Sequence, residues 1–181
     1  MLRRALVVGI DNYPSFGDLS GCVNDAHALA PLLSRNEDDS PNFDVRTLTA
    51  PAGSGLVDRD ELLEALDTLF GPGVDVSLLY FAGHGAPAGD QGDVTLVTSD
   101  GTTATPGVRF SEVLERINAC AQEVAVIVDC CYAGGAGSVQ AAMSSAAVLR
   151  QGVSLLTASR ADQTSAETAT GRGLFSEYLE G

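Results

Sequence analysis

The sequence predicts an α/β protein in which helices cover both faces of a mostly parallel β-sheet. Short runs made only of apolar residues recur along the 181-residue chain, and amphipathic segments separate them. A wholly apolar run is typical of a strand that is buried on both of its faces. The alternation of such strands with helices indicates βαβ units, and therefore three layers with the sheet in the middle. The length corresponds to one domain.

The first half of the chain is expected to contain two strands and two helices. A buried strand is predicted at 5–10, and apolar residues at one helical face predict a helix over 24–33. Pro31 lies within this helix, and we expect it to kink or end the helix. An acidic loop at 36–42 leads to a short strand at 45–48. Asp58, with a glutamate three residues later, resembles a capping box at the start of a second amphipathic helix.

The second half begins with a strong buried strand at 76–81, followed by a glycine-rich loop predicted at 82–93. Further strands are expected at the remaining apolar runs and helices at two amphipathic segments. The expected elements are a short strand or hairpin arm at 94–97, a helix around 110–117, strands at 124–128 and 153–156, a small-residue segment at 133–147 that is part helix, and a last helix at 174–179.

The charge excludes several classes of function. Ten basic residues, all arginine, against 24 acidic ones give a net charge of −14, which disfavours binding to nucleic acid or to anionic lipid. No apolar run approaches the roughly 20 residues of a membrane span. Four cysteines without regular spacing fit a reducing cytoplasm better than a disulfide scaffold, and no zinc motif is present. We therefore expect a cytoplasmic protein without a resident metal.

The residues that follow two of the strands carry chemistry. Parallel sheets place their sites beyond the carboxyl ends of the strands. His84 follows the strand at 76–81, and Cys130 and Cys131 follow the strand at 124–128. For any of these residues alone, a structural role is the simpler interpretation.

Together, these residues indicate nucleophilic catalysis. A histidine can activate a cysteine thiol and later protonate the leaving amine. The backbone N–H groups of Gly85 and Cys131 would then stabilise the oxyanion. Periodicity alone does not decide which of the two cysteines faces the histidine.

These motifs resemble those of a known family. The segment Tyr80–Gly85 and the segment Asp129–Gly134 resemble the His-Gly and D-x-C-x-x-G motifs of the caspase/metacaspase clan of cysteine proteases. The separation of 131 − 84 = 47 residues is close to the family's gap of roughly 50. The residues at 5–13 with 19–26, and those at 156–167, resemble the metacaspase start and the beginning of its small subunit. The pattern is most similar to the prokaryotic metacaspase-like, or orthocaspase, branch.

The resemblance implies a caspase-like three-layer α-β-α fold and a catalytic dyad of His84 and Cys131. Cys130 stands where the family usually has a small residue, and it is a substitute, a redox partner or neutral. Tyr132 stands where metacaspases commonly have histidine. The implied reaction is cleavage of protein substrates by an endopeptidase with a regulated role in prokaryotic signalling or defence.

The resemblance also implies the substrate pocket. Asp25 and Asp129 fall where metacaspases place the acidic walls of the primary pocket, and such a pair favours cleavage after Arg or Lys. The other residues implied to bind substrate are Cys22, Ala82 and Ser159. The structural alternative for Asp25 is a cap or first-turn acid of its helix. For Asp129 it is a backbone cap at the strand end.

Calcium is a further expectation, because many metacaspases require it. Asp90, Asp93, Asp100 and the acidic run at 37–39 have no EF-hand spacing, and solvated loops are the better interpretation of them. His27 is expected on the surface of the first helix or packed beneath it. A phosphate-binding fold is disfavoured because the loop after the first strand has no glycine-rich phosphate motif and carries acidic residues.

The resemblance divides the single domain 1–181 into a large-subunit-like part at 1–132, a linker-like segment at 133–150 and the start of a small-subunit-like part at 151–181. The family usually adds another strand, so we expect a truncated small subunit and a further effector domain or partner. The segment 133–147 contains no arginine, so self-processing would use Arg150 or Arg172. The alternative function is a catalytically idle caspase-like interaction module.

Overall fold

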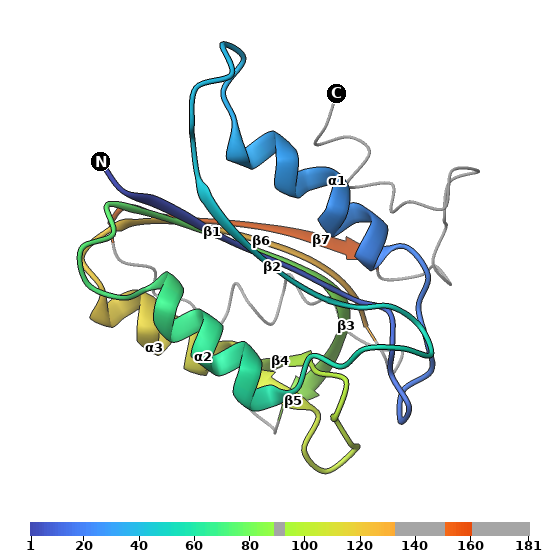
Figure 1. The fold of residues 1–181 in the computed structure, drawn as a ribbon. Coiled ribbons are helices and arrows are strands. Elements are labelled where there is room, and N and C mark those ends of the chain that lie inside the picture. Colours follow the sequence, from blue (N-terminus) through green and yellow to red (C-terminus); the bar gives the residue numbers. More distant parts are fainter. Residues whose placement is uncertain (89–92, 133–150, 161–181) are drawn as a thin grey trace.

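A computed structural model describes residues 1–88, 93–132 and 151–160, and it describes only the backbone at 131, 132 and 158–160. Within these residues, parallel strands follow one another across the sheet in the order β2, β1, β3, β6, β7 (Figure 1). Their bounds are Asp44–Ala50 for β2, Arg3–Ile10 for β1, Val76–Ala88 for β3, Glu123–Tyr132 for β6 and Val153–Arg160 for β7.

Helices cover both faces of this sheet, as the sequence predicts. Helix α1 (Cys22–Ser34) lies on one face, and helices α2 (Arg59–Leu69) and α3 (Phe110–Ala119) lie on the other. The expected helix at 174–179, the segment 133–147, Arg150, Arg172 and Asp90 lie outside the described residues.

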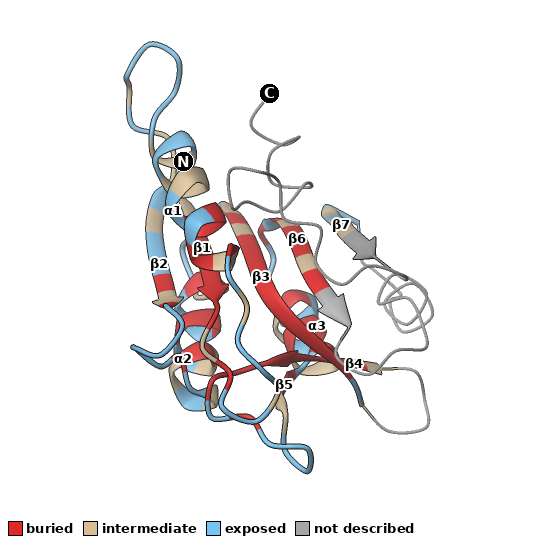
Figure 2. Cartoon of the chain, turned by 90° about the vertical axis from the view of Figure 1, so that its right-hand side faces the viewer, coloured by how far each residue is buried: buried red, intermediate tan, exposed pale blue. Residues whose placement is uncertain are grey.

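Two apolar clusters hold the layers together. The larger one lies between the sheet and helices α2 and α3, and the smaller one lies between the sheet and α1. Along β3, Leu79 and Phe81 belong to the larger cluster, whereas Tyr80 and Ala82 belong to the smaller one. This alternation is that of an extended strand, and it shows which face each of the residues 79–82 occupies. Most of β3 is buried (Figure 2).

The prediction of a loop at 82–93 is wrong, because β3 continues to Ala88. Its pairing with β6 runs on as far as Gly85 beside Tyr132, and from Gly85 onward β3 pairs antiparallel with β4 (Asp93–Val97). Strand β5 (Gly107–Arg109), which the sequence does not predict, pairs antiparallel with β4. Partners far along the chain therefore override the turn-like composition of these segments.

The expected effect of Pro31 is also wrong in part, because α1 continues past it to Ser34. A proline in a helix removes the hydrogen bond to the carbonyl four residues earlier, which is that of His27. Both Pro31 and His27 are exposed, so water can bind the freed carbonyl. The exposure of His27 confirms its expected place on the surface of the helix.

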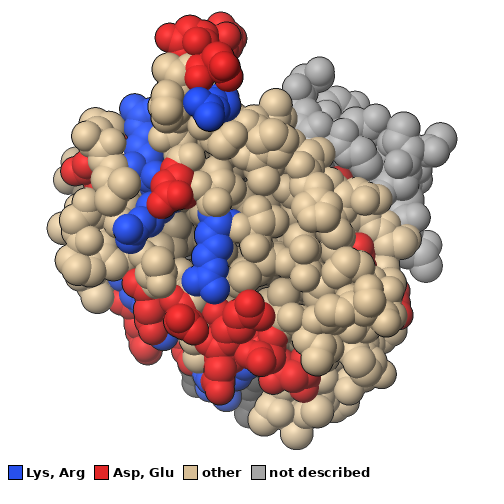
Figure 3. All heavy atoms as spheres, viewed as in Figure 1, with Lys and Arg blue, Asp and Glu red and all other residues tan. Residues whose placement is uncertain are grey.

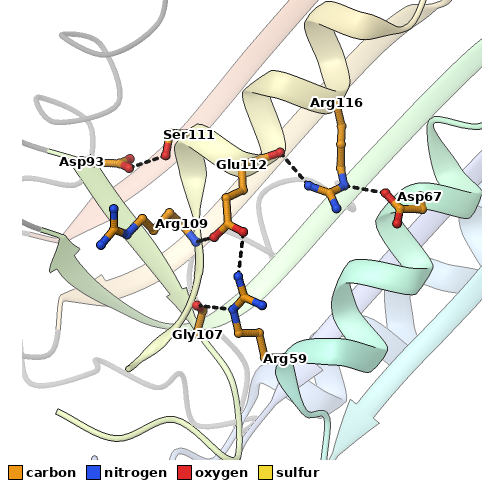
Figure 4. Close-up of polar contacts among 8 residues, drawn as sticks. All are labelled: Arg59, Asp67, Asp93, Gly107, Arg109, Ser111, Glu112 and Arg116. Atoms are coloured by element: carbon orange, nitrogen blue, oxygen red, sulfur yellow. Dashed lines mark hydrogen bonds and ion pairs between the residues drawn. The ribbon is translucent and has the colours of Figure 1, made fainter. Parts of the chain in front are cut away.

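Polar contacts join α2 to α3 on the outer face (Figure 4). Arg59 forms an ion pair of 2.7 Å with Glu112, and Arg116 forms one of 2.7 Å with Asp67. Partly exposed surface pairs of this kind each contribute about 0–1 kcal/mol, so they align the helices more than they stabilise the fold. The predicted cap of α2 is confirmed, because the Asp58 carboxylate accepts the Glu61 N–H at 2.8 Å.

Acidic side chains gather over α2 and at the tip of the loop at 36–42 (Figure 3). Exposed Asp60, Glu64 and Asp67 contribute to the patch on α2. This distribution agrees with the expectation that polyanions are repelled.

Candidate active site

Two rows of register partners cross the carboxyl end of the sheet. In the first row, Gly9 of β1 lies beside Ala82 of β3, which lies beside Asp129 of β6. In the second row, His84 of β3 lies beside Cys131 of β6. Neighbouring strands lie roughly 4.8 Å apart. The fold therefore places the backbones of the predicted histidine and cysteine next to each other, one pleat beyond Ala82 and Asp129.

The first of these rows lies on the face of the sheet that α1 covers. Ala82 is 2% exposed and belongs to the cluster under α1. Position 84 is two residues further along β3, where the imidazole packs against Tyr13 and Phe16 of the loop that follows β1. Ile127 packs against the same cluster, which assigns position 129 of β6 to this face as well.

The neighbouring Cys130 belongs to the opposite face. It is 2% exposed and lies in the larger core cluster with Val126 and Val128. Its register partner is Gly83 rather than His84. The register therefore sets Cys131, and not Cys130, beside His84, and Cys130 packs in the core beneath α2 and α3.

The imidazole of His84 is held through one of its nitrogens. Nε2 lies 2.9 Å from the carbonyl oxygen of Gly17, in the loop that follows β1. A carbonyl oxygen only accepts hydrogen bonds, so Nε2 carries the proton in the neutral ring. Nδ1, a buried atom, is then the nitrogen with the lone pair. This tautomer makes Nδ1 the basic atom of the ring.

Two aromatic rings from the same loop pack beside the imidazole. The Tyr13 ring lies 4.6 Å from it between centroids, and the Phe16 ring lies 6.5 Å from it. His84 is 8% exposed and Tyr13 is 1% exposed. Burial raises the pKa of Tyr13 well above its usual value of 10.0, and the nearby thiol of Cys22 adds to the rise. The Tyr13 phenol therefore stays protonated and neutral at every pH near neutrality.

Helix α1 approaches the first row closely. A Cβ at Gly9 would collide with the carbonyl oxygen of Cys22 and the Cβ of Ala26, so glycine is required where the helix crosses β1. Asp25, in the first turn of α1, is 3% exposed, and Cys22 is half-buried. Cys22 packs against the cluster that contains Ala82, and Asp25 lies in the same turn of α1. The interpretation of Asp25 as a first-turn acid is confirmed, and the two roles are compatible.

Asp11 fixes the start of α1. Its carboxylate accepts the backbone N–H groups of Gly21 at 3.2 Å, Cys22 at 3.0 Å and Val23 at 3.2 Å. Asp11 is 6% exposed. These N–H groups have no partner within a helix, and a carboxylate also complements the helix dipole. A side chain at the end of β1 therefore caps the helix that carries Asp25.

Removal of this cap should weaken the fold. We expect Asp11→Ala to lower the free energy of unfolding by roughly 2–3 kcal/mol, because it leaves several buried donors unpaired. Urea denaturation followed by circular dichroism measures the loss. Asp60→Ala, at an exposed position of α2, is the control and should change it by less than about 0.5 kcal/mol. Equal losses in the two variants would contradict the role of Asp11.

Gly85 and Ser159, also predicted in the site, are placed by the strand register. Gly85 of β3 lies beside Tyr132 of β6. Ser159 of β7 lies beside Cys130, and it is Arg160 that lies beside Cys131. The side chain of Ser159 is outside the described residues.

Sequence reasoning missed the roles of Asp11 and Gly17. Asp11 follows the first strand directly, which is a position where cap residues occur, but its partners lie 10 to 12 residues away. The contact of Gly17 is made by its backbone carbonyl, and a main-chain atom leaves no signal in residue type.

Two of the acidic residues considered for calcium accept hydrogen bonds from serine hydroxyls. Asp38 accepts the Ser40 hydroxyl at 2.6 Å, and Asp93 accepts the Ser111 hydroxyl at 2.7 Å. The hydrogen bonds from the hydroxyl and the backbone of Ser40 lower the pKa of Asp38. Within residues 1–88, 93–130 and 151–157, no three His, Cys, Asp or Glu side chains gather as metal ligands.

A model of the caspase domain family matches residues 2–180. The chain belongs to this family of cysteine peptidases. This caspase domain is 31% identical over 146 residues to metacaspase-3 of Trypanosoma cruzi, with 72% of the chain and 40% of that protein covered. It is 30% identical over 155 residues to metacaspase-7 of Arabidopsis thaliana, with 75% of the chain and 36% of that protein covered.

The caspase domain also has a relative among solved structures. The crystal structure of protein GSU0716 from Geobacter sulfurreducens superimposes with a TM-score of 0.69 at 19% identity, and the match covers 99% of this chain and 80% of that one. This likeness shows a shared fold, and together with the match to the caspase domain family it confirms the expected caspase-like fold. The chain spans about 40% of the length of the curated relatives it matches. No helix in the described part of this caspase domain is long and apolar enough to cross a membrane.

Proposed function

We propose that this domain is a cysteine endopeptidase that cleaves after a basic residue, with His84 and Cys131 as its catalytic dyad. The main observation behind this proposal is the strand register, which pairs His84 of β3 with Cys131 of β6. Its support comes from membership of the caspase-domain family and from the burial of Cys130 in the core, which leaves Cys131 as the cysteine on the row of His84.

The proposed reaction uses the tautomer of His84 described above. Nδ1 takes the proton of the Cys131 thiol while Nε2 keeps its own proton on the Gly17 carbonyl. The thiolate attacks the peptide carbonyl carbon, and the backbone N–H groups of Gly85 and Cys131 stabilise the oxyanion. The imidazolium then protonates the leaving amine as the C–N bond breaks. Water hydrolyses the resulting thioester and regenerates the thiol.

The proposed specificity comes from two carboxylates. Asp129 lies beside Ala82 on the α1 face, and Asp25 lies in the first turn of the helix above that face. Asp25 is 3% exposed, and a carboxylate in such surroundings interacts strongly with a cation. The proposed pocket for the side chain of Arg or Lys is completed by Ala82, Cys22 and Ser159.

The proposed setting is the reducing cytoplasm of a prokaryote, where a nucleophilic thiol stays reduced. The substrate there is a protein with an accessible basic residue, in regulated signalling or defence, and a further effector domain or partner protein takes part in the regulation. The proposed dyad reaction needs no cofactor. Calcium activation, which the resemblance to metacaspases suggests, is tested by the assay described next.

Cleavage of tetrapeptides that differ only in the residue before the scissile bond tests this function. We expect arginyl and lysyl peptides to be cleaved and the aspartyl peptide to resist. Parallel assays with calcium and with a chelator show whether the cation activates the enzyme. A preference for the aspartyl peptide would contradict the pocket. The failure of every peptide under every condition would favour an idle interaction module.

A further inference from the structure

We infer that Tyr13 is a positioning residue that holds His84 in its catalytic orientation. The inference rests on the proposed role of His84 as the base. The Tyr13 hydroxyl accepts the backbone N–H of His84 at 3.0 Å and lies 3.4 Å from the carbonyl oxygen of Val97, to which it donates. Its ring packs against the imidazole at 4.6 Å and is tilted by 53°. One side chain thus contacts both the backbone and the ring of His84.

The hydroxyl fills a gap in the sheet. On one edge of β3, the described pairing with β1 ends at Ala82, and the described pairing with β4 begins at Gly85. Gly83 and His84 therefore lie between two strand partners on that edge. The hydroxyl of Tyr13 gives the His84 N–H the acceptor that a neighbouring strand would otherwise supply. This contact fixes the backbone where β3 passes from its parallel to its antiparallel partner.

Gly83 makes room for this contact. A Cβ at Gly83 would collide with the Tyr13 hydroxyl and would also lie 3.2 Å from the Phe81 ring. The glycine before His84 is thus explained by the close approach of the tyrosine hydroxyl.

The loop that follows β1 links the contact on the His84 backbone to the contact on the His84 ring. The Tyr13 carbonyl accepts the N–H of Phe16 at 3.1 Å and the N–H of Gly17 at 2.9 Å. Asp18 Oδ1 accepts the Tyr13 N–H at 2.8 Å. Because the Gly17 carbonyl holds Nε2 of His84, this tight turn connects the residue that fixes the backbone of His84 to the atom that fixes its tautomer. A shift of Tyr13 would therefore move both.

The test combines kinetics with NMR of the imidazole nitrogens. Tyr13→Phe removes the hydroxyl and keeps the ring, and we expect kcat to fall roughly tenfold with KM almost unchanged, because small displacements of a reacting group are costly. The chain has two histidines, His27 and His84, so ¹⁵N spectra resolve each ring, and a His27→Asn variant assigns them. Wild-type His84 should show one tautomer with the proton on Nε2. In Tyr13→Phe its signals should shift toward an average of both tautomers.

Tyr80→Phe is the matched control. Tyr80 is also a fully buried tyrosine, but it lies four residues before His84 on β3, where Val7 and Ile127 are its register partners. Its variant should lose stability without a change in kcat or in the His84 spectrum. If Tyr13→Phe keeps the wild-type kcat and a single Nε2–H tautomer, the inference is overturned. The spectra answer this question even if no peptide is cleaved, so a failure of the proposed function remains distinguishable.

A second pair of variants covers the case in which Tyr13→Phe does not fold. Gly83→Ala should displace the hydroxyl and disturb the His84 tautomer. The double variant with Tyr13→Phe removes the collision and should be closer to wild type in thermal stability than Gly83→Ala alone. If the effects of the two substitutions on thermal stability are additive, the Tyr13 hydroxyl does not contact residue 83 and the inference is overturned.

Discussion

Cys131→Ala should lower peptide cleavage by at least about 10⁴-fold, because loss of the nucleophile leaves only binding and oxyanion stabilisation. Substrate binding should persist, since the proposed pocket residues are unchanged. Steady-state kinetics with an arginyl peptide, together with binding of an uncleavable analogue, measures both quantities.

Cys130→Ala is the control that fixes the register of the dyad. Cys130 is 2% exposed in the larger core cluster, so this substitution should cost about 1 kcal/mol of stability and leave most of the activity. Retention of activity by Cys131→Ala together with its loss in Cys130→Ala would shift the proposed nucleophile by one residue. That result would contradict the pairing of His84 with the nucleophile.

Replacement of either pocket carboxylate should cause the second large effect. We expect Asp129→Asn and Asp25→Asn each to lower kcat/KM for an arginyl peptide roughly 100-fold, because each leaves a desolvated guanidinium partly unpaired. A peptide with citrulline in place of arginine has nearly the same shape without the charge. The wild-type preference for arginine over citrulline should therefore collapse in both variants.

The charge-matched control for these variants is Asp60→Asn. Asp60 is exposed on α2, on the other face of the sheet, so its variant should keep the wild-type ratio of arginine to citrulline cleavage. Thermal denaturation separates a loss of pocket charge from a loss of fold. An unchanged ratio in Asp129→Asn and Asp25→Asn would show that these carboxylates do not bind the substrate cation.

The sequence predicts those parts of the fold that depend on local pattern. Uninterrupted apolar runs locate β1 and β6, because a strand buried on both faces needs such residues throughout. The run that locates β7 is interrupted by Ser154, and Leu156 within it is 45% exposed. The candidate dyad is predicted for a related reason. His84 and Cys131 follow two such runs, and parallel strands bring their carboxyl ends to one edge.

The remaining features depend on contacts between distant parts of the chain. The continuation of β3 to Ala88 needs β4 and β6 as partners, and glycines within it resemble a loop when they are considered alone. The bond from the His84 N–H to Tyr13 spans 71 residues, and the contact of Nε2 with Gly17 spans 67. Neither contact leaves a periodic trace in the sequence, so only the folded arrangement reveals how the base is held.

Covalent labelling tests the central claim most directly. The wild-type chain is treated with a peptide that ends in arginine and carries a cysteine-reactive electrophile, and the adduct is located by peptide mapping and mass spectrometry. We predict a single adduct on Cys131, which His84→Ala abolishes and an aspartyl analogue does not form. An adduct on Cys22, Cys120 or Cys130 instead would contradict a dyad of His84 and Cys131. Equal labelling of the His84→Ala variant, or equal labelling by the aspartyl analogue, would also contradict it.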